Sequence, residues 1–299
     1  MSEPLVTRAS RFAVRALLKP VLHPAVPIPL QRAWVSLATR TLRVPRGVRF
    51  ETVQLGAVSA ERVTHGHNRA TPRTAVLFFH GGGYILGSPR THRSIAGRIA
   101  LLSGAVAYVP RYRLAPEHPF PAALEDAVAA YRALMARDDA PRRVVVAGDS
   151  AGGGLALALA LRVRDAGLAQ PRGLALVSPW VDLTCSRLGD ARGDPLLRAS
   201  WLRQAAAGYL RGHRPDEPLA SPIHADLSGL PPTLIQCGTA EMVREDSRRL
   251  SDAMRAAGVS AELDEHAGMW HDFQLYAGIV PEATAAVRGL SSAISAWLA

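Results

Sequence analysis

A serine flanked by glycines is the residue whose setting most clearly suggests chemistry in this chain. Residues 148–152 read GDSAG, which has the form G-x-S-x-G around Ser150. The apolar, β-branched run 144–146 before it suits a buried strand, and the Ala/Leu-rich run 155–161 after it suits a helix. An abrupt strand-to-helix turn forces a serine into a strained backbone conformation with positive φ and exposes its hydroxyl. The segment predicts a nucleophilic Ser150, although five common residues can also match the pattern by chance.

A glycine-rich loop earlier in the chain gives a second signal. Residues 76–83 read VLFFHGGG, an apolar strand followed by His80 and three glycines. Acyl transfer needs backbone N–H groups aimed at the oxyanion, and glycines let the backbone approach a substrate closely. One donor is expected from the residue after the nucleophile, Ala151, and the others from this loop. The alternatives are a flexible turn or a phosphate-binding loop, but the latter needs a lysine that does not follow Gly83.

The base is sought beyond Ser150, because the usual order in such enzymes is serine, acid, histidine. Four histidines follow it, and His213 and His224 lie in polar, proline-rich surroundings. His271 lies in a glycine-bearing loop (residues 268–273, GMWHDF) between an expected strand and the C-terminal helix. We expect His271 to be the base, with His266 as the alternative.

The acid is sought after the segment 233–238, which reads as a strand ending at glycine. Glu241 lies three residues beyond that strand, where a carboxylate can reach an imidazole. Asp246 is the alternative, but we expect it inside a helix over 243–257, where Arg248 and Arg249 can solvate it. The sequence therefore favours Glu241 and leaves Asp246 open.

Long ordered motifs then identify a family resemblance. They are HGGG at 80–83, YRLAPEHPFPAALEDA at 112–127, GDSAGGGLA at 148–156, SPWVDLT at 178–184, DPLL at 194–197, LASPIHADLSGLPPTLIQ at 219–236 and GMWHDF at 268–273. From about residue 45 onward the chain resembles the hormone-sensitive-lipase-like family of bacterial α/β-hydrolase esterases. The resemblance implies Ser150 as nucleophile, His271 as base, and Gly82, Gly83 and Ala151 as oxyanion donors.

The chain departs from the family pattern at three places. Arg111 precedes YRLAPE where an acidic residue is usual, and Glu241 stands where many members have aspartate. Tyr84 follows HGGG where phenylalanine is frequent, which should change only the polarity of the pocket.

The arrangement of expected elements predicts the fold class. Helices alternate with the later strands, which indicates a mostly parallel eight-stranded sheet covered on both faces, the α/β-hydrolase fold. The expected strands are 48–55, 62–65, 75–79, 106–111, 144–148, 174–178, 233–238 and 261–266, and the expected helices are 122–137, 151–165, 243–257 and 281–298. Residues 1–46 precede the expected hydrolase domain of residues 47–299, and that domain contains an insertion at about 181–218 with a helix over 195–211. The resemblance implies that both segments form a helical cap. Candidates to line the acyl pocket are Tyr84, Trp180, Trp201, Tyr209 and Met269, each of which can equally be core packing.

Composition excludes several other classes. The net charge is +10, but residues 1–50 hold eight arginines and Lys19 against Glu3, a net of +8, so the rest contributes only +2. No nucleic-acid-binding motif accompanies this charge. The segment 5–22 alternates apolar and basic residues at helical spacing, which indicates a solvated helix face or, alternatively, docking on an anionic membrane surface. Two cysteines build no disulfide framework, and we see no signal peptide or membrane span, so a cytoplasmic protein is expected.

These observations predict a serine carboxylesterase that acts on short- to medium-chain acyl esters. It should work through a Ser150–His271–Glu241 triad and a covalent acyl-enzyme, with no metal or other cofactor. Its partner should be a small-molecule ester, with no nucleic acid and no stable membrane insertion, and a homodimer stays open. The alternatives are a lactone or N-acetyl hydrolase on the same residues, or a non-catalytic ligand-binding relative.

Overall fold

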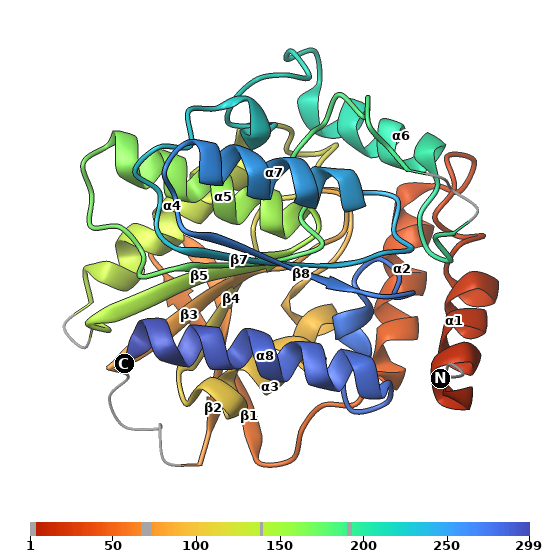
Figure 1. Cartoon of the computed structure of the whole chain (residues 1–299), viewed down its shortest axis with the longest axis horizontal. Helices are drawn as coiled ribbons and strands as arrows, with labels where there is room; N and C mark the ends of the chain where they lie inside the picture. Colours follow the sequence, from red (N-terminus) through yellow and green to blue (C-terminus); the bar gives the residue numbers. More distant parts are fainter. Residues whose placement is uncertain (1–3, 67–72, 138–139, 190–192) are drawn as a thin grey trace.

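Eight strands form one sheet through the centre of the molecule (Figure 1). The computed structural model describes residues 4–66, 73–137, 140–189 and 193–299. The strands are β1 (Val48–Leu55), β2 (Val58–His65), β3 (Thr74–Phe79), β4 (Val106–Pro110), β5 (Arg143–Asp149), β6 (Leu174–Val177), β7 (Thr233–Gly238) and β8 (Ala261–His266). Their order is β1-β2-β4-β3-β5-β6-β7-β8, in which β2 is antiparallel to both of its neighbours and every other pair is parallel. The predicted α/β-hydrolase fold is therefore confirmed.

Side chains alternate between the two faces of the sheet and build two cores. In β3, Ala75, Leu77 and Phe79 belong to one core, whereas Val76 and Phe78 belong to the other. Helices α4 (Ala122–Met135), α5 (Ala151–Asp165) and α7 (Arg244–Ala256) cover the first face, and α3 (Arg93–Ser103) and α8 (Pro281–Leu298) cover the second (Figure 1). Parallel strands covered on both faces are apolar throughout, and for this reason β3 to β7 could be predicted from the sequence.

The expected strands and helices differ from the observed ones mainly at their ends. Strand β2 begins at Val58, four residues before the predicted start, because the whole of Val58–His65 pairs with β1. Helix α3 was not predicted from the sequence. Its Ser94 and Arg98 are buried polar residues that donate to the backbone of Arg43, and they hide the periodicity of an amphipathic helix.

The N-terminal segment and the insertion after β6 contact each other. The N-terminal segment forms α1 (Leu5–Leu17) and α2 (Ile28–Ala38), and the insertion after β6 contains α6 (Ala199–Leu210), which is shorter than the predicted helix (Figure 1). The Trp201 indole N–H donates to the Gln31 side chain at 2.7 Å, and the Gln204 amide donates to the Pro24 carbonyl at 3.4 Å. Hydrogen bonds thus join two parts of the chain about 170 residues apart.

Helix α1 buries only part of its apolar face. Val14 is buried, whereas Phe12 and Leu17 are 73% and 55% exposed.

No helix in the described part of the chain is long and apolar enough to cross a membrane. Cys185 and Cys237 are free and buried.

Candidate active site

Ser150 occupies the turn between β5 and α5 in a conformation that few residues adopt. Its φ and ψ are 52° and −121°, and its carbonyl accepts from the Trp180 amide at 3.0 Å. A side chain at Gly148 would lie 2.3 Å from the Gly152 carbonyl oxygen, and one at Gly152 would lie 2.1 Å from the Phe79 carbonyl oxygen. Both glycines are therefore required by close backbone packing, and the strain is held by the strand and helix on either side.

The glycine loop after β3 faces Ser150. Gly82 and Gly83 have φ of 121° and 62° and line the same cavity as the serine. In the described part of the chain, no hydrogen bond engages the amides of Gly82, Gly83 or Ala151. Ala151 is the first residue of α5, so its N–H has no intrahelical partner. Three free donors at one cavity can stabilise an oxyanion.

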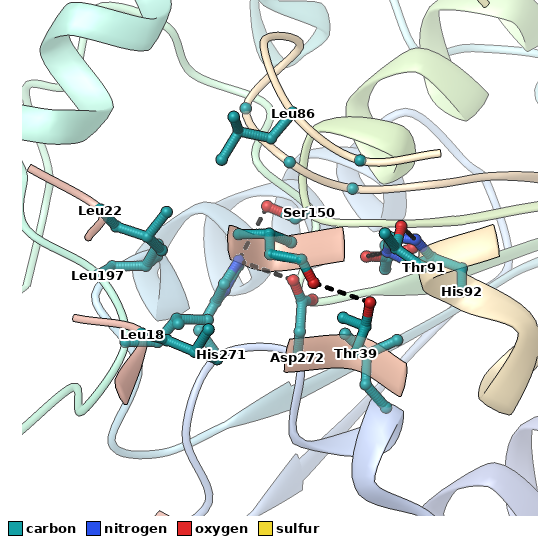
Figure 2. Close-up of a pocket in the computed structure, with 18 of the residues that line it drawn as sticks. Leu18, Leu22, Thr39, Leu86, Thr91, His92, Ser150, Leu197, His271 and Asp272 are labelled. Atoms are coloured by element: carbon teal, nitrogen blue, oxygen red, sulfur yellow. Dashed lines mark hydrogen bonds and ion pairs between the residues drawn. The ribbon is translucent and has the colours of Figure 1, made fainter. Parts of the chain in front are cut away.

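His271 lies between the serine and a carboxylate. Its Nε2 is 2.8 Å from Ser150 Oγ, within hydrogen-bond distance (Figure 2). Its Nδ1 is 3.6 Å from Glu241 Oε2. The loop that follows β8 carries the histidine, and the Met269 carbonyl in it accepts from the Ala240 amide at 2.9 Å. This bond ties the histidine loop to the loop that carries Glu241.

Glu241 is buried and is positioned by two further residues. The Ser178 hydroxyl, at the end of β6, donates to Glu241 Oε2 at 2.6 Å. Asp194, from the insertion, accepts from the Met242 amide at 2.9 Å and so fixes the backbone next to the glutamate. A carboxylate held in this way can orient an imidazole and stabilise its charged form.

The alternative residues have other partners. Asp246 Oδ2 accepts from the amides of Val181 and Asp182, both at 3.0 Å, and so anchors the chain after β6. His266 Nε2 is 3.0 Å from Asp264 Oδ2, and its ring packs on Phe273. Neither residue lines the cavity at Ser150.

The electrostatic setting of His271 favours its protonated form. Burial works against a charged imidazole, but the carboxylates of Asp272 and Glu241 outweigh it and hold the pKa of His271 well above its ordinary value. Asp272 Oδ2 lies 3.2 Å from Nε2 (Figure 2). Burial raises the pKa of Asp272 to about 6 even though the charge of His271 opposes the rise.

A cavity of about 740 Å³, its open mouth included, connects these groups to the N-terminal segment. Its apolar lining includes Leu18, Leu22, Leu86, Leu196 and Leu197. Of the predicted pocket residues, Trp201 lines this cavity. Tyr84, Trp180, Tyr209 and Met269 are buried and are not in its lining, since Tyr84 stacks on Tyr209 at 3.8 Å and packs near Trp180 within the core.

Several residues that surround Ser150 and His271 were not singled out from the sequence. Asp149 and Asp272 stand next to Ser150 and His271 in the sequence, so adjacency was the available signal. His92 and Ser178 have no such signal, because only the fold brings them to the site. In the described residues, no group of three or more potential metal ligands is present.

Comparison with known proteins agrees with this geometry. Residues 76–275 match the α/β hydrolase fold family. The chain is 41% identical over 260 residues to "Acetyl-hydrolase" of Streptomyces hygroscopicus, covering 82% of this chain and 87% of that protein. It is 37% identical to "Putative acetyl-hydrolase LipR" of Mycobacterium tuberculosis, covering 90% and 87%. A crystal structure of an esterase from the bacterial hormone-sensitive lipase family superposes with a TM-score of 0.93 at 34% identity, covering all of both chains.

A serine on a strained strand–helix turn, next to a histidine and within this sheet, defines an α/β-hydrolase. The chain belongs to the bacterial hormone-sensitive-lipase-like family of esterases, and it is a carboxylic ester hydrolase.

Proposed function

We propose that this enzyme hydrolyses short- to medium-chain acyl esters by two-step acyl transfer through a Ser150–His271–Glu241 triad. The observation that carries the proposal is the 2.8 Å separation of Ser150 Oγ and His271 Nε2, with Glu241 on the opposite side of the imidazole. His271 takes the proton as Ser150 attacks the ester carbonyl, and an acyl-enzyme forms as the protonated alcohol leaves. A water activated by the same histidine then releases the acid.

The negative charge of each tetrahedral intermediate needs donors in place before the reaction. The free amides of Gly82, Gly83 and Ala151 supply them, each worth about 3 kcal/mol of transition-state stabilisation. The 3.6 Å between His271 Nδ1 and Glu241 Oε2 exceeds a hydrogen bond, so the pair must tighten as the imidazole gains its proton.

The acyl-chain range is inferred from the cavity. Leucines from the N-terminal segment and the insertion line it beside Ser150, and they suit an aliphatic chain. Because leucines of both segments line the cavity beside Ser150, we infer that residues 1–46 and the insertion act as a cap that excludes water from the acyl-enzyme.

Replacement of Ser150 tests the triad. Ser150→Ala should lower kcat for p-nitrophenyl butyrate more than about 10⁴-fold with little change in melting temperature, because the change removes a nucleophile and no packing contact. The matched control is Ser186→Ala at an exposed position, which should retain the parent activity. Mass spectrometry of the parent quenched during turnover should show the acyl adduct on the peptide that contains Ser150. Turnover of Ser150→Ala within tenfold of the parent would refute the assignment.

A second candidate is the hydrolysis of acetyl groups specifically, including acetamides. It is favoured by the names of two relatives, each called an acetyl-hydrolase. A panel of acetate, butyrate and octanoate esters, tested beside an acetanilide, separates the two candidate functions. A dedicated acetyl hydrolase should lose activity from the acetate to the butyrate ester.

A further inference from the structure

The N-terminal segment exposes an unusual share of the apolar side chains of this protein. Among the described residues, ten large hydrophobic side chains are exposed, and seven of them belong to α1 and α2. These seven are Leu5, Val6, Phe12, Leu17, Leu30, Trp34 and Leu37. Exposed apolar side chains gathered in this way mark a surface that contacts a protein partner or a membrane.

Helices α1 and α2 lie against each other, so their exposed side chains are close together. The Trp34 indole N–H donates to the Leu17 carbonyl at 2.8 Å, which joins the end of α1 to the middle of α2. Leu30, Trp34 and Leu37 follow one another at spacings of four and three residues, so they form one stripe along α2. Figure 1 shows the two helices side by side at one edge of the molecule.

This apolar surface is accompanied by positive charge. Residues 4–46 contain no aspartate or glutamate. Arg8 and Arg15 are exposed on α1, about one helical turn before and after Phe12, and Arg40 is exposed just beyond the end of α2. Among the described residues, no ion pair engages any of these three arginines. The surface therefore offers both an apolar contact and positive charge that the described part of the chain does not neutralise.

The same surface lies beside the cavity that contains Ser150. A second hollow of about 790 Å³, its open mouth included, is lined by Leu17 and other residues of α1 and by residues after α2. Four residues line both this hollow and the Ser150 cavity, namely Leu18, Thr39, Leu42 and Tyr276. The two hollows are therefore neighbours, and a molecule that covers the exposed side of α1 and α2 stands next to the catalytic cavity.

We propose that the exposed apolar side chains of α1 and α2, together with Arg8, Arg15 and Arg40, dock this enzyme reversibly on the surface of an anionic phospholipid bilayer. Such a surface has phosphates for the arginines and hydrocarbon beneath them for the apolar side chains. A second copy of this chain suits the apolar side chains less well, because it brings the positive charges of two copies together. The docked enzyme takes its esters from the membrane surface, and this last step rests on the proposed function.

Vesicle flotation measures the docking directly. The vesicles contain either ether-linked phosphatidylcholine alone or an equal mixture with ether-linked phosphatidylglycerol, because ether lipids offer no ester for the enzyme to cleave. Two variants of the full chain are compared with the parent. Arg8→Gln/Arg15→Gln removes two charges from α1, and Leu37→Ser removes an exposed apolar side chain from α2.

Each variant has a matched control on another part of the protein. Arg132→Gln/Arg288→Gln removes two exposed arginines from α4 and α8, so it changes the net charge equally. Leu102→Ser makes the same substitution as Leu37→Ser at an exposed position on α3.

The parent should bind the mixed vesicles at least about tenfold more tightly than the neutral ones, and added salt should weaken this binding. Arg8→Gln/Arg15→Gln should lower the affinity about 25-fold, because each arginine near an anionic surface contributes about fivefold. Leu37→Ser should lower it about fivefold, since a buried leucine is lost from the contact. Both controls should stay within about twofold of the parent, because charges farther away than the Debye length are screened.

Equal binding of the parent to both kinds of vesicle, or equal losses in the variants and their controls, would overturn the proposal. A parent that ignores vesicles and forms dimers in analytical ultracentrifugation, which Leu37→Ser dissociates, would also overturn it in favour of a second copy. Hydrolysis of dissolved p-nitrophenyl butyrate is measured separately and should be retained by every variant. Its absence from the parent would count against the proposed function and not against the docking, which vesicle flotation detects without turnover.

Discussion

Replacing Asp246 by asparagine should stabilise the protein increasingly as the pH rises and leave catalysis nearly intact. Asp246 is 2% exposed, and burial raises its pKa from 3.8 to about 7, although the amides of Val181 and Asp182 favour its charged form. Asparagine keeps the shape and an oxygen for those amides but never ionises. The charge is therefore the quantity that the substitution removes.

The size of the effect follows from the difference between the folded and unfolded pKa. A carboxyl whose pKa is raised on folding binds its proton more tightly in the native state, so stability is lost as the pH rises above 3.8 and the loss levels off above 7. The raised pKa of Asp246 costs about 1.7 kcal/mol of stability at pH 5 and about 4.3 kcal/mol at pH 8, at 1.36 kcal/mol per pKa unit. The parent should therefore lose about 2.6 kcal/mol relative to Asp246→Asn between these two pH values.

Urea unfolding of both proteins at pH 5 and pH 8 measures this difference, and the other titrating groups cancel between parent and variant. Asp252→Asn on the exposed face of α7 is the control and should show no pH-dependent difference. A parent–variant difference that stays constant within about 0.5 kcal/mol from pH 5 to pH 8 would refute the argument. Loss of ester hydrolysis by more than a hundredfold in Asp246→Asn would instead return Asp246 to consideration as the triad acid.

Four further outcomes are expected. Glu241→Gln should lower kcat by about 10⁴-fold, as amide replacement of a triad carboxylate does, and an effect below tenfold would remove Glu241 from the triad. Asp272→Asn should move the acid limb of the kcat/KM profile to lower pH, because it removes a carboxylate that raises the pKa of His271; an unmoved limb would contradict this. For p-nitrophenyl esters, kcat/KM should rise by up to about fourfold per methylene until the cavity ends, and Trp201→Ala should move that break to longer chains. Deleting residues 1–40 should reduce ester hydrolysis more than it reduces the far-UV circular dichroism signal of the folded protein. Full activity of the truncated protein on every ester would exclude a cap role for this segment.

Much of this protein was predictable because its signals are local. The central strands are apolar runs bounded by turns, and the serine turn is encoded by two glycines within five residues, so neither needs knowledge of distant neighbours. His271 could be proposed as the base and Glu241 as the acid because each follows a strand that the sequence predicts. Parallel strands end at one edge of the sheet, so these two residues are expected near each other. The sequence favoured Glu241 as the acid but left Asp246 open, because both follow β7 within nine residues.

Tertiary structure decided which carboxylate faces the imidazole and what surrounds it. Asp246 turns to the backbone after β6, whereas Glu241 is held by Ser178, 63 residues away in the chain. The helix over 93–103 was hidden, because its buried polar side chains are satisfied only by groups that folding brings from elsewhere. The pairing of His92 with Asp149 likewise depends on the tertiary structure, because the two residues belong to different strand–helix units. Local sequence determines backbone shape, but burial, hydrogen-bond partners and pKa values depend on atoms that are adjacent only in the folded chain.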